Sequence, residues 1–393
     1  MQLYLIHTAA PFKALHLGAG PLGLGLLAAA ATGTYALAVL VTGRIGDRAP
    51  RLLLARTACI GAILACIGLT LADRLTLLLL FMPLVGASMA FFWPNVQASI
   101  GDQSTLGDLP RQLGRFNLSW SSGKACGFLF GGAILSALGA SSTFTVASLI
   151  LFAIFFVLPM PESRQGPLSA LLERGSAREV STTAAPLGVA AELPAIDPRA
   201  TVFRRLAWAA NCTAFGLGAT LTFHYPRMVA ARDWSPRVFG VFLGLVYLTQ
   251  TLTFALLMRR PEAWRFRRLR LYLPQVLMVV AAAALPLADR ARLGVSALVF
   301  GAGLGICYCS SIYYSLLTHE RRGRNAGVHE ALIGLGAMMI PFTGGLLARV
   351  LESAWAPYLA AAASVALSLV LQEILYRSGR TVNADRAGVE ARG

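Results

Sequence analysis

The chain has 393 residues, of which 56% are hydrophobic and 13% charged, and its formal net charge is +16. A soluble core of this length cannot hold so many apolar residues, because the charges are confined to short gaps between long apolar runs. The basic excess does not indicate nucleic-acid binding, since no nucleic-acid-binding motif accompanies it. The composition therefore predicts an all-α integral membrane protein.

Apolar stretches long enough to cross the bilayer recur along the whole chain, since about 20 residues span the hydrocarbon core as a helix. Residues 1–15 come first but reach only about 22 Å, so we expect a shortened first helix, through either a late start site or a true truncation. With no basic start and no cleavage site, they do not read as a signal peptide. The eleven full spans lie near residues 22–42, 52–72, 75–99, 116–138, 143–160, 206–229, 236–258, 271–288, 293–317, 325–349 and 354–376.

A compact charged turn, residues 43–51 with the sequence GRIGDRAPR, joins the second and third spans. A glycine, an aspartate four residues on and a basic residue directly after it resemble the cytoplasmic signature loop of the major facilitator superfamily. The resemblance implies a gate in which the aspartate faces the amino end of a helix in the other half. A solvated turn that only follows the charge topology would carry the same residues. The implied gating residues are Gly43, Asp47, Arg48, Arg51 and Asp102.

An internal repeat divides the chain into two similar halves. At an offset of 215 residues Pro21 pairs with Pro236 and Gly86 with Gly301, and near the end the offset falls to 213. Both halves have an even number of spans, so the repeats are parallel. With the charged turn, this resembles the twelve-helix, 6+6 fold of the superfamily. The predicted domains are a six-helix bundle at 1–158, a cytoplasmic linker at 159–203, a second bundle at 204–376 and a cytoplasmic tail at 377–393.

The placement of basic residues sets the expected orientation. With the charged turn inside, 25 Lys and Arg lie in inner segments and 8 in outer loops, as the positive-inside rule requires. We therefore expect a multi-pass protein of the cytoplasmic (inner) membrane, monomeric, with both termini in the cytoplasm. The basic run at residues 259–270 predicts contact with anionic lipid headgroups.

The fourth and tenth spans are expected to line a cavity, because the resemblance implies this for the first, fourth, seventh and tenth spans. Polar and aromatic residues recur at helical spacing on one face of the fourth span, and the repeat places similar residues in the tenth. They suit an organic solute with an apolar body, although packing between helices uses the same residue types. The predicted cavity residues of these spans are Ser88, Phe92, Trp93, Asn95, Tyr308, Ser310 and Tyr314.

Lys124 is one of two lysines in the chain and falls deep inside the fifth span. Ionisable groups in hydrocarbon are costly and usually face a cavity or a partner. Lys124 shares a helix face with Asn117 and Ser121, and we predict that these three residues line the substrate cavity. The alternative is an ion pair that only holds helices together.

Glu330 and His329 lie in the eleventh span, where Glu330 is the repeat partner of Asn117. A buried carboxylate can take up and release a proton as water access alternates between the two sides, and histidine titrates near neutral pH. We predict that Glu330 couples transport to protons and that His329 shares this role. A structural salt bridge of Glu330 to Arg324 or Lys124 is the alternative.

Motifs for other chemistry are missing from the sequence. The six cysteines lie in predicted spans without metal-ligand spacing, no GxxxxGK[ST] motif is present to use ATP, and HExxH and GxSxG are absent. We expect no cofactor, no metal site and no enzymatic activity. The sequence predicts a secondary active transporter of a small organic solute, coupled to protons; the alternative is a non-transporting sensor or degenerate paralogue. Efflux and uptake stay equally open.

Overall fold

The computed structural model describes residues 1–46, 49–103, 109–159, 199–317 and 322–390. Nine helices in these ranges are long and apolar enough to cross a membrane. The helices are α1 (Gln2–His16), α2 (Pro21–Gly46), α3 (Arg51–Leu71), α4 (Leu75–Gln103), α5 (Leu109–Val157), α7 (Ala200–Ala231), α8 (Pro236–Arg259), α9 (Arg268–Ala284), α10 (Arg290–Leu316), α11 (Arg322–Val350) and α12 (Ala356–Glu390), with 3₁₀ turns η1 (Pro261–Ala263) and η2 (Leu285–Leu287).

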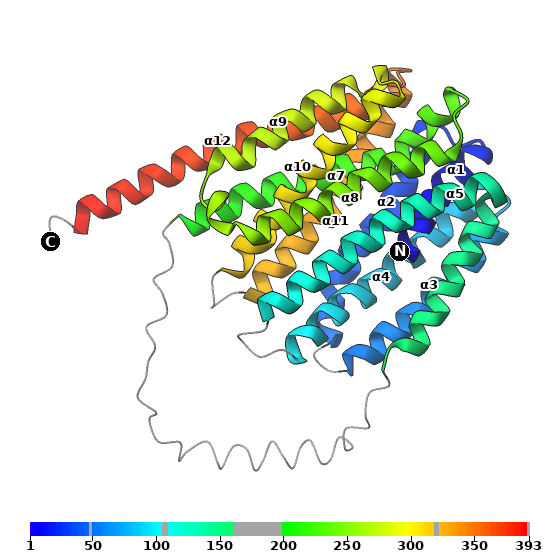
Figure 1. The fold of residues 1–393 in the computed structure, drawn as a ribbon, viewed down its shortest axis with the longest axis horizontal. Helices are drawn as coiled ribbons and strands as arrows, with labels where there is room; N and C mark the ends of the chain where they lie inside the picture. The colour runs from blue at the N-terminus through cyan, green and yellow to red at the C-terminus, as the bar shows by residue number, and fades with distance from the viewer. Residues whose placement is uncertain (47–48, 104–108, 160–198, 318–321, 391–393) are drawn as a thin grey trace, which may run out of the picture.

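The predicted twelve-helix class is confirmed. Within the described ranges α5 holds two crossings, because Gly139 has φ +80° and ends one helix before the next begins. The 32-residue α7 and the short, 15-residue α1 complete the set. The last helix, α12, continues to Glu390, past the expected start of the tail at residue 377. Figure 1 shows the blue-to-teal helices of the first half beside the green-to-red helices of the second.

The sequence repeat is also a repeat of helix packing. Pro21 and Pro236, which are 215 residues apart, both begin a helix. A Cβ on Gly86 of α4 would lie 2.0 Å from the carbonyl oxygen of Ala31 in α2, and a Cβ on Gly301 of α10 would lie 2.2 Å from that of Val246 in α8. Only glycine permits such a close approach of two backbones. Each half therefore packs its second helix on its fourth in the same way.

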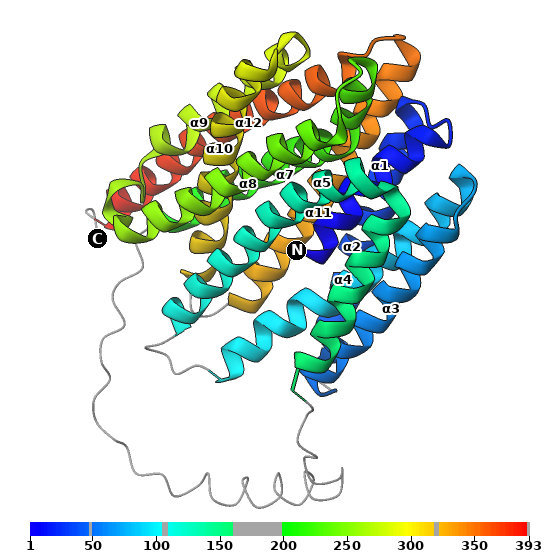
Figure 2. The same cartoon turned by 45° about the vertical axis from the view of Figure 1, so that its right-hand side comes forward.

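Two seams join the halves, α2 against α11 and α5 against α8, and Figure 2 shows α5 beside α8. In the α5/α8 seam a Cβ on Gly132 would meet the Cα of Gly240 at 2.7 Å. In the α2/α11 seam a Cβ on Gly25 would meet the Pro341 carbonyl oxygen at 2.9 Å. Small residues let membrane helices approach this closely. Both contacts lie toward the far end of the bundle, the end opposite Leu158 and Arg199, which flank the linker.

Large apolar side chains face outward from the helices, as a bilayer requires. Leu71, Val157 and Leu298 are 73%, 82% and 57% exposed. Each half keeps its own apolar core beneath this surface, one mostly within α1 to α5 and the other mostly within α7 to α12. The space left between the two cores is the candidate functional site.

Candidate functional site

A cavity of about 160 Å³ lies between the two halves, lined by residues of α1, α2, α4, α5, α7, α8, α10 and α11. A water molecule needs about 10 to 15 Å³ by this measure, so the space holds on the order of ten waters or one small organic molecule. Its polar, charged and aromatic wall residues include Tyr4, His7, Tyr35, Trp93, Gln97, Trp120, Lys124, Phe215, Thr222, Tyr247, Tyr308 and Glu330.

Lys124 of α5 lies in this wall inside a cage of aromatic rings, and its residue is 6% exposed. Among the described residues no carboxylate pairs with its ammonium group. Each ring face contributes roughly 0.5 to 2 kcal/mol to holding a cation. The distances from Lys124 Nζ to the ring centroids are 3.8 Å for Tyr247, 5.0 Å for Tyr4, 5.2 Å for Trp120 and 5.4 Å for Phe215.

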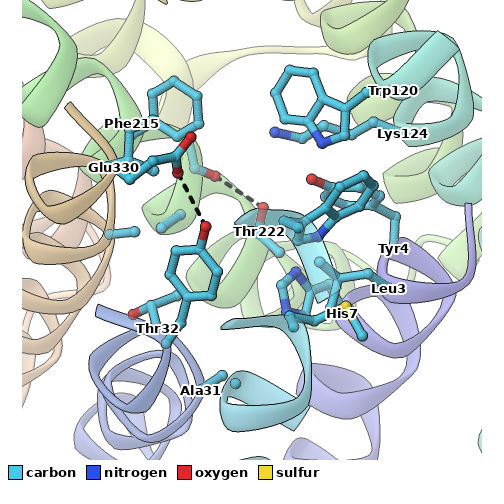
Figure 3. Close-up of a pocket in the computed structure, with 18 of the residues that line it drawn as sticks. Leu3, Tyr4, His7, Ala31, Thr32, Trp120, Lys124, Phe215, Thr222 and Glu330 are labelled. Carbon is cyan, nitrogen blue, oxygen red and sulfur yellow. Dashed lines mark hydrogen bonds between the residues drawn. The ribbon is translucent and has the colours of Figure 1, made fainter. Parts of the chain in front are cut away.

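Glu330 of α11 enters the same cavity from the second half. Tyr35 of α2 donates its hydroxyl to Glu330 Oε2 at 3.0 Å, so the contact joins the two halves. Figure 3 shows Glu330 beside Phe215, and Lys124 beside Trp120 on another side of the cavity. The two side chains therefore have different partners, and no ion pair joins Lys124 to Glu330 among the described residues.

His329 points away from the cavity, into the second half. Its Nδ1 lies 2.7 Å from Ser311 Oγ and 3.4 Å from Asn211 Nδ2. Ser315 Oγ donates to the carbonyl of Ser311 and accepts from Trp208 Nε1. His329 thus belongs to a buried polar cluster behind Glu330, and its predicted share in proton coupling stays a prediction.

The cavity face of α4 differs from the predicted one. Trp93 lines the cavity together with Gly86, Met89 and Gln97. The predicted Ser88 instead approaches α3, since a Cβ on Gly61 would lie 2.6 Å from its Oγ. Phe92 packs in the core of the first half, and Asn95 donates to the carbonyl of Phe91 at 2.7 Å. The predicted polar residues Ser88 and Asn95 are packed against α3 or bonded to their own helix, whereas Gln97, which was not predicted, is the polar residue of α4 that lines the cavity.

In the tenth and fifth spans, too, the residues that line the cavity differ in part from the predicted ones. Tyr308 lines the cavity, but the Tyr314 hydroxyl accepts a hydrogen bond from the amide of Phe266 at 2.8 Å. Ser310 lies with Tyr314 in a separate small pocket near η1. Ser121 donates to the carbonyl of Asn117 at 2.8 Å, and neither residue lines the cavity. In α5 the residue that shares the cavity with Lys124 is Trp120, one turn earlier.

Several wall residues escaped sequence reasoning, namely Tyr4, Tyr35, Phe215 and Tyr247. They come from four helices, and nothing in the chain order shows that their rings meet.

The predicted gating residues Asp47 and Arg48 lie outside the described residues. Gly43 and Asp102 fall in the last turns of α2 and α4, and Arg51 begins α3. The gating role of all five stays a prediction.

Two pseudo-symmetric bundles that enclose a cavity with buried charges define a multi-pass membrane transporter. The family model described as Major Facilitator Superfamily matches residues 1–319, and the chain belongs to this family. A search of curated proteins found no match.

Solved structures share the fold over nearly the whole chain. Two are of a bacterial homologue of the human lysosomal transporter Spinster. The inward-facing, occupied one has 16% identity and a TM-score of 0.65, covering 97% of this chain and 94% of that one. The inward-facing, unoccupied one has 17% identity and a TM-score of 0.62, covering 98% and 97%. A POT family transporter in complex with a thioalcohol-conjugated peptide has 11% identity and a TM-score of 0.70, covering 96% and 95%. At these identities the likeness is one of fold.

Proposed function

We propose that this chain is a secondary active transporter that moves a small organic solute by alternating access and couples the movement to protons. One observation carries the proposal: the carboxylate of Glu330 lies in the cavity wall and is held by Tyr35 of the other half. A group that can bind a proton is thus part of the contact between the halves, at the place where a solute would bind.

The coupling follows from the strength of this hydrogen bond. A hydroxyl donates more strongly to a charged carboxylate than to a neutral acid. Protonation of Glu330 therefore weakens the bond to Tyr35 and loosens the α2/α11 seam at the depth of the cavity. The backbone contacts at Gly25 and Gly132 toward the far end do not involve a titratable group. A proton would thus favour separation of the halves on one side of the cavity more than on the other.

The aromatic wall supports an organic solute. Trp120 of the first half stacks on Tyr308 of the second with ring centroids 5.4 Å apart, and Tyr308 also contacts Phe215 at 5.8 Å. Ring faces bind apolar or flat groups well. The Trp120–Tyr308 pair joins the two halves one turn from Lys124, on the side of the linker. There it would close the cavity over a bound solute.

The charge distribution supports an orientation in a cytoplasmic (inner) membrane in which the linker end faces the cytoplasm. The end of α8, the connection that follows it and the first turn of α9 carry exposed arginines at 259, 260, 267, 268 and 270. Such a segment suits the anionic headgroups of the cytoplasmic leaflet. The predicted domain boundaries and the cytoplasmic termini belong to this same proposal.

The test starts from a thermal-shift screen of the purified protein against sugars, organic acids, nucleosides and cationic drugs. A binding solute is then assayed in proteoliposomes with and without a pH gradient. Glu330→Gln should abolish gradient-driven accumulation and keep solute exchange without a gradient, because exchange need not release the proton. Glu373→Gln is the matched control, since Glu373 pairs with Arg268 and Arg377 on the surface of α12.

Two outcomes would contradict the proposal. Accumulation that survives Glu330→Gln would remove this residue from coupling. Binding of a solute without any flux in the wild-type protein would favour the alternative, a sensor or degenerate member of the family.

A further inference from the structure

Apart from His7, the residues described for the cavity wall include one acidic and one basic side chain, and these two lie on separate helices. Lys124 of α5 is surrounded by ring faces, and Glu330 of α11 accepts from Tyr35. The ring faces favour the ammonium form of Lys124 because their negative faces attract a cation. The ammonium group of Lys124 has no hydrogen-bond acceptor among the residues that the structure describes, so its N–H donors are available to a ligand.

The two charges make the empty cavity electrically neutral when Glu330 is ionised. A solute with one negative charge that binds at Lys124 would leave an excess negative charge in a low-dielectric space, which is unfavourable. Protonation of Glu330 removes that excess. A solute anion and a proton should therefore promote the binding of each other, and thermodynamic linkage makes the effect equal in both directions.

Other titratable groups that face Glu330 do not supply this balance. On the elements around it they are Tyr35 of α2, Tyr308 of α10 and Tyr4 of α1, with His7 of α1 and Lys124 across the cavity. The tyrosines are neutral at physiological pH. His7 has its ring against Tyr4 and Phe223, at 5.9 and 5.4 Å between centroids. Facing residues of α4 and α7, such as Gln97 and Phe215, carry no charge.

The surroundings of Lys124 also select the body of the solute. Aromatic rings from four different helices meet around its ammonium group. A carboxylate can bind the ammonium while an apolar, flat body lies against the rings of Trp120 and Tyr308. The cavity of about 160 Å³ limits this body to roughly one or two rings.

We propose that the solute is an organic monoanion with a flat apolar body, whose carboxylate binds Lys124, and that it binds together with one proton on Glu330. The inference rests on the proposed function and adds to it the substrate class and the mode of coupling, symport of one anion and one proton. The proton comes from the solvent on the side to which the cavity is open, and it leaves with the anion on the other side.

The first experiment separates charge from shape. Benzoate, 3-phenylpropionate and indole-3-acetate are each compared with the corresponding carboxamide and amine in binding assays on the purified full-length protein. At least one carboxylate should bind about tenfold or more tightly than its amide and its amine, since an anion paired with an ammonium gains a charge-assisted hydrogen bond. Lys124→Gln should remove this preference, and Lys124→Arg should keep part of it.

The control uses the other lysine of the chain. Lys13 of α1 donates to the carbonyls of Leu69 and Thr70 at the end of α3, outside the cavity. Lys13→Gln removes the same charge and should leave the preference for the carboxylate unchanged. Thermal melting of each variant reports whether it is folded. Should Lys124→Gln fail to fold, Lys124→Arg and Phe215→Leu still test whether Lys124 and the rings around it set the preference for the carboxylate. Both variants keep a cavity wall of similar size.

The second experiment measures protons directly. Calorimetry in buffers with different ionisation enthalpies should show uptake of up to one proton per carboxylate bound, and tighter binding as the pH falls. In Glu330→Gln both effects should disappear while the carboxylate still binds. Proton release on binding, or uptake that persists in Glu330→Gln, would overturn the symport assignment.

The outcomes also separate this inference from the proposed function. If amides or amines bind best and are accumulated by a pH gradient, the monoanion is wrong and the proton-coupled transporter stands. If no carboxylate binds in preference to its amide, the substrate class is wrong whatever the transport assay shows. If a carboxylate binds as expected but no solute is moved, the inference about the site holds and the transport function fails.

Discussion

Tyr35 and Glu330 form one hydrogen bond of 3.0 Å between α2 of the first half and α11 of the second. The residues are 295 positions apart in the chain and meet only because the two halves close on each other. The bond therefore reports on the relative position of the halves as well as on the charge of the carboxylate.

Tyr35→Phe should loosen the α2/α11 seam without altering its packing. A hydrogen bond to a charged group contributes about 1.5 to 3 kcal/mol, and about 1.4 kcal/mol is a factor of ten in population. We expect hydrogen–deuterium exchange of α2 around residues 33–42 to rise about tenfold or more. Equal exchange in both proteins would show that the bond does not hold the seam.

A disulfide across the far end should lock the protein. Ser136 of α5 and Ser235, at the start of α8, have hydroxyl oxygens 2.8 Å apart and are exposed. Ser136→Cys combined with Ser235→Cys should cross-link under oxidation and stop solute flux, because the proposed alternating access requires these ends to separate. A reductant should restore flux, and either single variant should be insensitive to oxidation. Full transport by the cross-linked protein would refute a moving far end.

Gln275 of α9 and Gln372 of α12 exchange two side-chain hydrogen bonds, at 3.1 and 2.8 Å, inside the second half. In apolar surroundings each side-chain amide depends on the other for a hydrogen-bond partner. Gln372→Leu should lower the free energy of unfolding by about 1 to 2 kcal/mol, since it leaves the carbonyl of Gln275 unpaired. The double variant with Gln275→Leu should regain much of this loss in a thermal-melting cycle, and strict additivity would count against the pair.

Replacing the equivalent glycines of the two repeats by alanine should lower the stability of the protein to a similar extent. Gly86→Ala and Gly301→Ala each place a methyl group against a backbone carbonyl, and overpacking of this kind costs about 1 to 3 kcal/mol. Gly294→Ala is the control, because a Cβ there meets nothing within 4 Å, and the helix should gain about 0.5 to 1 kcal/mol. Melting temperatures of the three variants test the pattern.

Asp47→Asn should slow conformational exchange and leave equilibrium solute affinity largely intact, since Asp47 belongs to the predicted gating loop rather than to the cavity. The measurement compares the rate of solute exchange in proteoliposomes with binding to the detergent-solubilised protein. Loss of binding in a folded variant would place this residue in the binding site.

The architecture was accessible from sequence because it depends on the lengths of apolar runs and on the spacing of Pro and Gly. Pro21 and Pro236 begin equivalent helices, and Gly86 and Gly301 make equivalent contacts. Lys124 and Glu330 could be found because charges inside a bilayer are costly and therefore rare.

The cavity face of α4 could not be found in the same way. The face of α4 that meets the cavity was inferred from the positions of polar residues. However, Asn95 forms a hydrogen bond with a carbonyl of its own helix, and Ser88 packs against α3. A polar side chain in a membrane helix can be satisfied locally, so polarity does not show which face meets water. The cage around Lys124 depends on how four helices cross, and the pattern along any one of them does not contain that information.

The tight glycine contacts at the far end would give a rotation of the halves about them a long lever arm. Between Gly132 and Leu109, the start of α5, a helix covers roughly 35 Å at about 1.5 Å per residue. A rigid-body rotation of about 10° around the seam would then part the linker ends by about 6 Å, more than the thickness of an aromatic ring. A small angular change about these contacts would thus be enough to let a flat molecule pass. A bulky side chain at Gly132 or Gly240 would clash with the facing backbone at this contact, although neither residue lines the cavity.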